Sequence, residues 1–390
     1  MRKLSQLITG LAVVTLGLAT AAPASAGSHV PVAGSGSSYA GIAVDVWAQN
    51  LRPAGIVLDY NPDGSAAGQD DYISAQDDFA ITDQPFRTSV DKLAGLGPQH
   101  VPYGFSYLPA VGGGTALLYH LSVHGHQITN LRLSGKTLME IFTGQITNWD
   151  DPRITHDYGT KLPSLPIIPV IHSDLAGSTF YLTSWLAKVF PTQWNAFCQK
   201  VHPGITLPCG PTEQYPLFGN ATSVNGSGNV ASYIAASSSN GAIGYDEYLY
   251  GVIDRVPVLA LQNPAGDYVL PNSLDVTTAL KAALINENPD SPHFLQEDLD
   301  PVYQDKNPKS YPLSNYSYFI VPRTGTRLPV HFTKAKGKTL SLFTEFGLCS
   351  GQRMASLLGY APLPPNLTAG GLLEIKRIPG HVAVPAHCPR

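Results

Sequence analysis

The amino-acid sequence predicts an α/β protein with two domains. Three strand–small turn–helix units recur along the chain, at residues 34–47, 55–73 and 167–187. Each unit leads into an expected helix, and the helices of the first and third units have an apolar face at helical spacing. About 360 residues remain after an N-terminal targeting segment, a length that suits two domains. Hydrophobic residues make up 43% of the chain, which excludes a disordered protein.

The first 26 residues are expected to be a signal peptide. Met1–Lys3 is positively charged, residues 7–21 are apolar, and Ala24-Ser25-Ala26 is a small-residue cleavage site. The apolar stretch is too short to span a membrane, and no later segment is long enough. We therefore expect an exported, soluble protein, periplasmic or extracellular. No Cys follows the cleavage site, so we expect no lipid anchor on an N-terminal Cys.

Composition excludes several classes of protein. Charged residues make up 13% of the chain, about half the usual share. A net charge of −4 gives no basic footprint for nucleic acid. The turn Gly34-Ser35-Gly36 lacks the third glycine and the acidic residue of a dinucleotide site, and a Walker A lysine is missing. The sequence therefore implies no nucleotide and no other cofactor.

Four cysteines in an exported chain make two disulfides the default expectation. Cys198 and Cys209 are close in sequence and are expected to close a small loop. Cys349 would then pair with Cys388 and hold the C-terminal tail. Their spacings do not resemble a zinc site.

A hydrolase is the least favoured class. The chain has no Gly-x-Ser-x-Gly elbow and no His-Glu-x-x-His motif. His120, His124 and His126 form the one local group of histidines, in a polar loop with no acidic partner nearby in sequence. We interpret this group as solvated surface and expect no enzyme and no metal site.

The segment around residues 167–187 is the strongest candidate for a functional site. An apolar strand, residues 167–171, is followed by Ser173 and Asp174, which are expected to cap a helix, and by Gly177. Such a corner leaves several backbone N–H groups unpaired at the positive end of a helix, where an anion binds well. The alternative is an ordinary strand–helix corner, and this segment alone does not decide between them.

Further elements are expected along the chain. A strand over residues 78–85 ends on a carboxylate, Asp83. Ser134 and Gly144 bound a capped helix. The remaining expectations are a turn at 148–154, a turn at 225–229 before a helix at 230–236, a buried strand at 241–245, a helical stretch at 276–284 in an otherwise polar region 259–311, a strand at 318–321 and a helix at 338–348.

The chain resembles the phosphate-binding subunit, of the PstS type, of bacterial phosphate ABC importers. The most specific match is residues 133–152, Leu-Ser-Gly-Lys-Thr-Leu through Phe-Thr-Gly-Gln-Ile-Thr-Asn-Trp-Asp-Asp-Pro. Residues 78–85, 183–189 and 241–248 support it. The resemblance implies a two-lobed α/β fold of the type II periplasmic-binding class with the ligand in the cleft. Lobe one would be residues 27–102 plus 312–390, and lobe two residues 103–311.

The resemblance also implies a site for inorganic phosphate or a related oxyanion, delivered to a membrane ABC permease by a monomeric binding protein. The positions that match the family's phosphate contacts are Ser38, Tyr39, Ser65, Asp83, Gly177 and Ser178; His172 and Ala176 occupy two further contact positions, and Asp174 is a supporting residue. Asp83 would accept a hydrogen bond from a protonated phosphate oxygen and repel sulfate, which carries no proton at neutral pH.

Ser38 stands where the family has Thr and Tyr39 where it has Phe, and both keep the donors, but two other departures matter. His172 stands where the family has Arg, and Ala176 stands where it has Ser. Loss of one charge-assisted bond and one hydroxyl weakens binding by roughly 2–5 kcal/mol. Asp174 could hold His172 protonated, so binding could strengthen in acid. The alternative is a secreted or surface interaction protein that keeps the fold and has lost tight phosphate binding.

Overall fold

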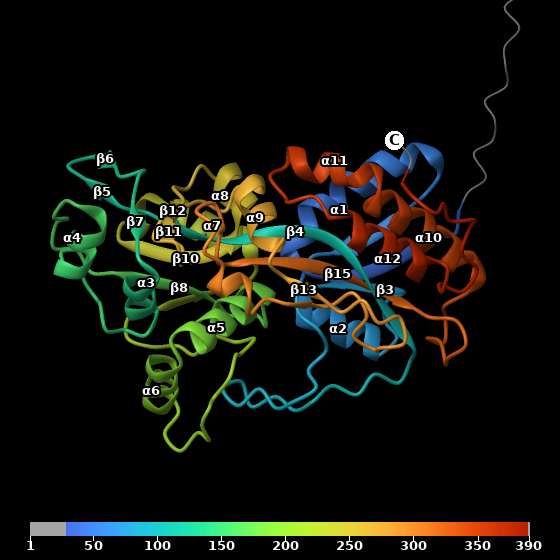
Figure 1. Ribbon diagram of the computed structural model, residues 1–390, viewed down its shortest axis with the longest axis horizontal. Helices are drawn as coiled ribbons and strands as arrows, with labels where there is room; N and C mark the ends of the chain where they lie inside the picture. The colour runs from blue at the N-terminus through green and yellow to red at the C-terminus, as the bar shows by residue number, and fades with distance from the viewer. Residues whose placement is uncertain (1–28, 389–390) are drawn as a thin grey trace, which may run out of the picture.

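The computed structural model describes residues 29–388, which form a single eight-stranded sheet flanked by helices on both faces (Figure 1). The expected signal peptide, residues 1–26, lies outside the described residues. The strand order is β2-β1-β3-β15-β4-β10-β8-β9. The strands are β1 (Val32–Gly36), β2 (Leu58–Asn61), β3 (Phe79–Thr82), β4 (Phe105–Tyr119), β8 (Ile168–His172), β9 (Thr222–Val224), β10 (Ala242–Glu247) and β15 (Ser314–Pro322).

Two long strands join the two halves of this sheet. β1, β2 and β3 are parallel to one another, and so are β8, β9 and β10. β4 pairs antiparallel with β15 from Phe105 to Gly114 and then with β10 from Thr115 to Tyr119. The register of β15 shifts between Tyr316 and Tyr318. The chain therefore crosses from one half to the other along β4 and returns along β15.

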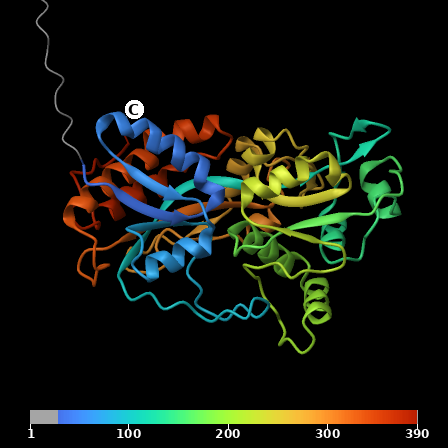
Figure 2. The same ribbon diagram turned by 180° about the vertical axis from the view of Figure 1, so that it is seen from behind.

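Helices cover both faces of each half (Figures 1 and 2). The helices of the first half are α1 (Ser38–Leu51), α2 (Ser65–Ile73), α10 (Lys334–Leu348), α11 (Ser350–Leu357) and α12 (Pro365–Ile375). Those of the second half are α3 (Gly135–Phe142), α4 (Pro152–Tyr158), α5 (Gly177–Val189), α6 (Pro191–Val201), α7 (Ser227–Ala235), α8 (Tyr248–Ile253) and α9 (Ser273–Leu280). In Figure 1, α2 and α5 lie below the sheet, and α1 and α7 lie above it.

Short strands and turns complete the described chain. They are β5 (Ser122–Val123) with β6 (His126–Gln127), β7 (Arg132–Leu133) with β11 (Ala260–Gln262) and β12 (Tyr268–Val269), β13 (Leu284–Ile285) with β14 (Glu297–Asp298), and the 3-10 turns Arg52–Ala54, Ser237–Ser239 and Val302–Gln304. Within residues 29–388, no helix has both the length and the apolar character that crossing a membrane requires.

Aromatic side chains fill the core of both halves. Trp47 of α1 packs against Phe319 of β15 and Phe343 of α10 in the first half. Phe142 packs against Tyr245 of β10 in the second half. Burial of apolar surface is the main driving force of folding. It packs the helices against the sheet and thereby fixes the positions of the ends of β1, β3 and β8.

Most expected elements are confirmed, but residues 34–36, expected as a turn, lie in β1, and residues 152–154 of the expected turn at 148–154 begin α4. The expected capping of α5 is also wrong. Ser134 caps α3 by accepting a hydrogen bond from the N–H of Thr137, as expected. Ser173 and Asp174 do not cap the central helix, because α5 begins later, after Ala176, and no side chain caps it. Asp174 instead accepts a hydrogen bond from the N–H of Gly226, at 2.7 Å.

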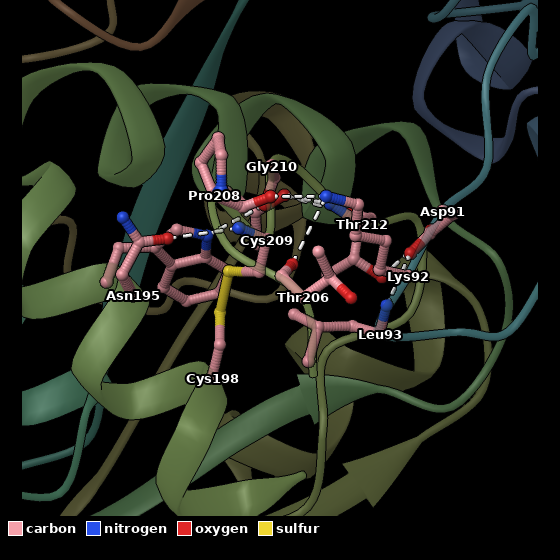
Figure 3. The surroundings of a disulfide bond; sticks show 12 residues. Asp91, Lys92, Leu93, Asn195, Cys198, Thr206, Pro208, Cys209, Gly210 and Thr212 are labelled. Carbon is pink, nitrogen blue, oxygen red and sulfur yellow. Dashed lines mark hydrogen bonds between the residues drawn. A yellow bond between two sulfur atoms is a disulfide. The ribbon is translucent and has the colours of Figure 1, made fainter. Parts of the chain in front are cut away.

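Both expected disulfides are present. Cys198 at the end of α6 is bonded to Cys209, and Cys349 at the end of α10 is bonded to Cys388 in the tail. The first bond closes a short loop beside α6 (Figure 3). The second fastens residue 388 to α10, as the sequence predicted.

Candidate functional site

Asp83 directly follows β3 and is almost completely buried, with 2% of the residue exposed. Ser37 and Ser317 donate hydrogen bonds to its Oδ1 at 2.7 and 2.6 Å. Ser65 donates to its Oδ2 at 2.9 Å. Burial holds the pKa of Asp83 above its ordinary value, and the hydrogen bonds from these three hydroxyl groups offset only part of that rise. A carboxylate accepts about four hydrogen bonds, so one acceptor position of Oδ2 stays available.

Gly177, the first residue of α5, lies directly against Asp83. A Cβ atom on Gly177 would lie 2.5 Å from both the Cβ and the Oδ2 of Asp83. Asp83 belongs to the first half of the sheet and Gly177 to the second. Only a residue without a side chain permits this approach, and the contact brings the two halves together at the ends of β3 and β8.

Four helix N-termini meet around these two residues. α1 and α7 approach one another through the hydroxyl groups of Ser38 and Ser227, whose oxygens are 2.9 Å apart. α2 begins at Ser65, which is bonded to Asp83, and α5 begins at Gly177. No side chain caps α2, α5 or α7. Their first N–H groups, with the helix dipoles, suit an anion.

His172, the last residue of β8, is buried at 1% exposure beside this junction. Its Nδ1 lies 3.3 Å from Oδ1 of Asp174, and its Nε2 lies 3.2 Å from Oγ of Ser178. Burial alone would lower the pKa of His172, but Asp174 and the buried Asp246 outweigh it and hold that pKa above its ordinary value. The imidazole therefore carries more positive charge near neutral pH than a free histidine does.

Comparison with known proteins identifies the family. A family model described as "PBP superfamily domain" matches residues 19–344. A phosphate-binding protein PstS of Xylella fastidiosa is 30% identical over 342 residues, which cover 87% of this chain and 83% of the relative. The chain belongs to the PstS-type phosphate-binding proteins. A PstS protein of Methanocaldococcus jannaschii is 25% identical over 394 residues, covering 97% of this chain and 96% of the relative.

Solved structures show the same fold. A high-affinity periplasmic phosphate-binding protein, PfluDING, solved with bound phosphate, matches with a TM-score of 0.65 at 17% identity and covers 87% of this chain and 92% of that chain. A phosphate-binding protein from Stenotrophomonas maltophilia matches with a TM-score of 0.63 at 15% identity and covers 92% and 98%. The expected two-lobed α/β fold of a PstS-type protein is confirmed, and this is a family of binding proteins rather than enzymes.

The residues at the family's contact positions lie at one junction, but they differ in whether they can donate a hydrogen bond to a ligand. Ala176 has no polar side-chain atom, and its N–H already donates to the carbonyl oxygen of Glu213 at 3.0 Å. The hydroxyl group of Tyr39 is buried against Gly113 and has no partner among the described residues. Gly177 and Ser178 supply the first N–H groups of α5. Because no side chain caps α5, these two N–H groups can donate to a ligand.

Several residues at the junction were missed by sequence reasoning. Ser317 lies 234 positions after Asp83 and comes from a strand with no motif. Ser37 precedes a predicted helix, and its role as the cap of α1 was a signal that could have drawn attention to it. Ser227 opens α7 after the glycine-rich turn at 225–229 and could have been found in the same way. Nothing in the local sequence marks Ser317.

Buried acidic groups surround the junction. Burial raises the pKa of Asp246 to about 7, although the nearby His172 lowers it. Burial also raises the pKa of Glu297 to about 8. Glu297 lies 3.0 Å from the hydroxyl of Tyr181, which also donates to the carbonyl oxygen of Asp83. The region 259–311, which carries no motif, thus places a carboxyl group beside the site. Among residues 29–388, no group of three or more His, Cys, Asp or Glu side chains is arranged to hold a metal.

Proposed function

We propose that this protein binds inorganic phosphate, or a related protonated oxyanion, between its two lobes and delivers it to a membrane ABC permease. The observation that carries the proposal is Asp83, a buried carboxylate with three hydroxyl donors, one available acceptor position and four helix N-termini around it. The helix ends attract a negative ligand, and Asp83 selects one that still carries a proton.

The chemistry of Asp83 sets the specificity in this proposal. A hydroxyl group on the ligand donates to the remaining acceptor position of Oδ2, which satisfies both partners. Sulfate has no hydrogen to donate, so its oxygen would face a buried carboxylate oxygen without a bond. That mismatch disfavours sulfate strongly because neither group can return to water.

The lobes close about β4 and β15, the two long strands that join the halves of the sheet. In our proposal, lobe one comprises residues 27–102 plus 312–390, and lobe two comprises residues 103–311. β4 opens lobe two and β15 opens the second segment of lobe one; the two strands pair with each other and act as the hinge, near the register shift of β15 and the glycines at 112–114. Contact between Asp83 and Gly177 then marks the closed state.

His172 takes over part of the role of the arginine that the family has at this position. Its raised pKa, held by Asp174, supplies a positive charge beside Ser178. An imidazolium gives one donor where a guanidinium gives two, so phosphate binds less tightly than with Arg and more tightly in acid.

Calorimetric titration tests the proposal. The purified protein is titrated with phosphate, arsenate and sulfate between pH 5 and 8. We expect heat with phosphate and arsenate, larger affinity at the acid end, and little or no binding of sulfate. Absence of heat with every oxyanion over this range would remove the proposal.

A second candidate is an exported interaction protein that keeps the fold without tight phosphate binding. It is favoured by Ala176, which offers the ligand no donor, and by the two bonds that already engage His172. Under this candidate the double variant His172→Arg with Ala176→Ser gains phosphate binding where the unaltered protein has none. Tight binding by the unaltered protein removes this candidate.

A further inference from the structure

An arm formed by residues 84–100 leaves lobe one between β3 and β4 and reaches lobe two. It folds back on itself: the N–H of Arg87 donates to Oε1 of Gln99 at 2.9 Å, and the N–H of Gln99 donates to the carbonyl of Arg87 at 2.8 Å. The amide of Gln99 donates to Asp70 of α2 at 3.2 Å. The base of the arm is thus fastened to a helix whose N-terminus lies at the candidate phosphate site.

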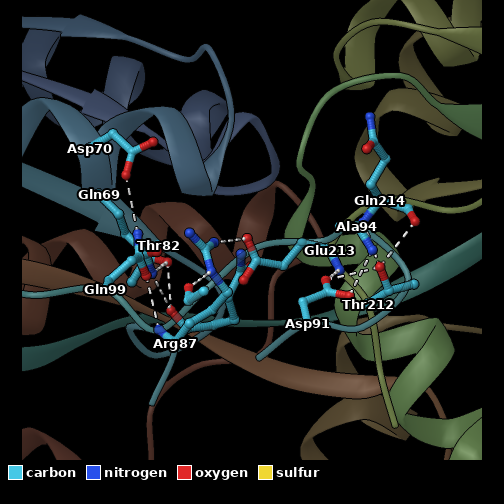
Figure 4. A network of polar contacts seen from close by, with 12 residues as sticks. Gln69, Asp70, Thr82, Arg87, Asp91, Ala94, Gln99, Thr212, Glu213 and Gln214 are labelled. Atoms are coloured by element: carbon cyan, nitrogen blue, oxygen red, sulfur yellow. Dashed lines mark hydrogen bonds and ion pairs between the residues drawn. The ribbon is translucent and has the colours of Figure 1, made fainter. Parts of the chain in front are cut away.

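The far side of the arm holds Thr212 and Glu213 of lobe two (Figure 4). Nη1 of Arg87 lies 2.6 Å from Oε2 of Glu213, and their side chains are only 12% and 2% exposed. Oδ2 of Asp91 accepts hydrogen bonds from the hydroxyl of Thr212 and from the N–H of Glu213, both at 2.9 Å. A buried, charge-assisted pair of this kind is favourable while its partners are in contact, and separating them leaves buried charges without compensation.

Glu213 is also joined to the first turn of α5. Its carbonyl oxygen accepts the N–H of Ala176 at 3.0 Å, and Ala176 directly precedes Gly177. Thr212 is tied to the same helix, since its N–H donates to Oγ1 of Thr183 at 3.0 Å and its carbonyl accepts from that hydroxyl at 2.9 Å. Arg87 of the arm pairs with Glu213, and Glu213 accepts the N–H of Ala176, the residue before Gly177. These contacts connect the arm of lobe one to the turn that presents Gly177.

The segment that receives the arm is held in place by the first disulfide. Nζ of Lys92 donates to the carbonyl oxygens of Thr206 and Pro208, at 3.2 and 2.7 Å. Cys198 of α6 and Cys209 close the loop that carries both carbonyls (Figure 3). A cross-linked loop has fewer conformations, so the arm docks onto a pre-formed surface.

We infer that Arg87 and Asp91 are positioning residues for anion binding: they hold Thr212 and Glu213, which fix the N-terminus of α5 when the lobes close. The inference rests on the proposed function for its ligand, but neither residue is assigned a contact with phosphate. Separation of the lobes breaks the Arg87–Glu213 and Asp91–Thr212 contacts and leaves the turn before Gly177 less constrained. The arm therefore slows release of the ligand.

Three variants test the inference. Arg87→Met removes the charge, Asp91→Asn weakens the second contact, and Arg87→Lys restores a cation without the planar fork. The matched control is Arg153→Met, because Arg153 pairs with Asp151 and Glu140 inside lobe two alone. We expect Arg87→Met to speed phosphate dissociation about tenfold or more, with little change in the association rate and partial recovery in Arg87→Lys. The control leaves both rates unchanged.

Two measurements without phosphate separate this inference from the proposed function. Hydrogen exchange of residues 173–180 should accelerate in Arg87→Met and Asp91→Asn, because the N–H of Ala176 loses its fixed acceptor. Spin labels at Lys136→Cys and Lys338→Cys, one in each lobe, should lie farther apart in these variants; all four native cysteines are in disulfides, so labelling is selective.

Unchanged exchange and unchanged label distances overturn the positioning role, whatever phosphate does. If the unaltered protein binds no phosphate, the proposed function fails, and the exchange and distance data still decide whether the arm holds α5. If Arg87→Met loses thermal stability, Arg87→Lys decides the question, because it keeps the ion pair. Its hydrogen exchange should lie between that of the unaltered protein and that of Arg87→Met.

Discussion

Replacement of Gly177 by Ala tests whether the two lobes meet at Asp83. The added Cβ would lie 2.5 Å from Cβ and Oδ2 of Asp83. Carbon atoms in ordinary contact lie about 3.5 Å apart, so the groups must separate by about 1 Å. Overpacking of this kind costs about 1–3 kcal/mol. Because only the closed state carries that cost, the dissociation constant for phosphate should rise about 5- to 150-fold.

The same substitution should destabilise the protein without ligand less than it weakens binding, because the ligand-free protein can open and relieve the contact. Gly177 lies in the first turn of α5, and alanine is a better helix former than glycine by up to about 1 kcal/mol. Calorimetry measures the binding, and thermal unfolding without phosphate measures the stability. Gly97→Ala is the control, since a Cβ there meets nothing within 4 Å. Unchanged phosphate affinity, or an equal loss of ligand-free stability, would refute closure at this contact.

Three further predictions follow from the same geometry. Asp83→Asn should weaken phosphate and strengthen sulfate binding, because an amide can donate to an unprotonated oxygen; a titration with both anions that shows no change in their ratio contradicts it. His172→Arg should tighten phosphate binding and remove the rise in affinity from pH 8 to pH 6, which a pH series of titrations measures. Burial raises the pKa of Glu297 to about 8, so the folded protein holds a proton that the unfolded chain loses near its ordinary pKa of about 4.3. The free energy of unfolding should therefore fall as the pH rises through this interval, and Glu297→Gln should flatten the fall in urea titrations; equal slopes in both proteins would exclude it.

Local sequence patterns predicted the two parts of the candidate site that lie at strand ends, the turn before α5 and the end of β3. The turn after β8, with Gly177 opening a helix, follows from an apolar strand, a small residue and a helical stripe. Local sequence showed Asp83 as the carboxylate that ends a short apolar strand, and its role in the site came from the resemblance to PstS-type proteins. Strong local patterns of this kind need no information from the rest of the chain.

Contacts between distant segments could not be predicted in this way. Ser317 reaches Asp83 only because β15 pairs with β3, and the arm finds Glu213 only when both lobes have folded. Asp174 was expected to cap α5, yet the N–H of Gly226, from a turn 52 residues later, takes its carboxylate. Tertiary partners compete with local capping, and their competition is invisible in a single sequence.

Titration of the unaltered protein with phosphate and sulfate at neutral pH tests the central claim most directly. If a buried carboxylate selects a protonated anion at the junction of four helix ends, phosphate binds at one site and sulfate at the same concentrations gives no comparable heat. Equal binding of the two anions, or no binding of phosphate, would contradict it.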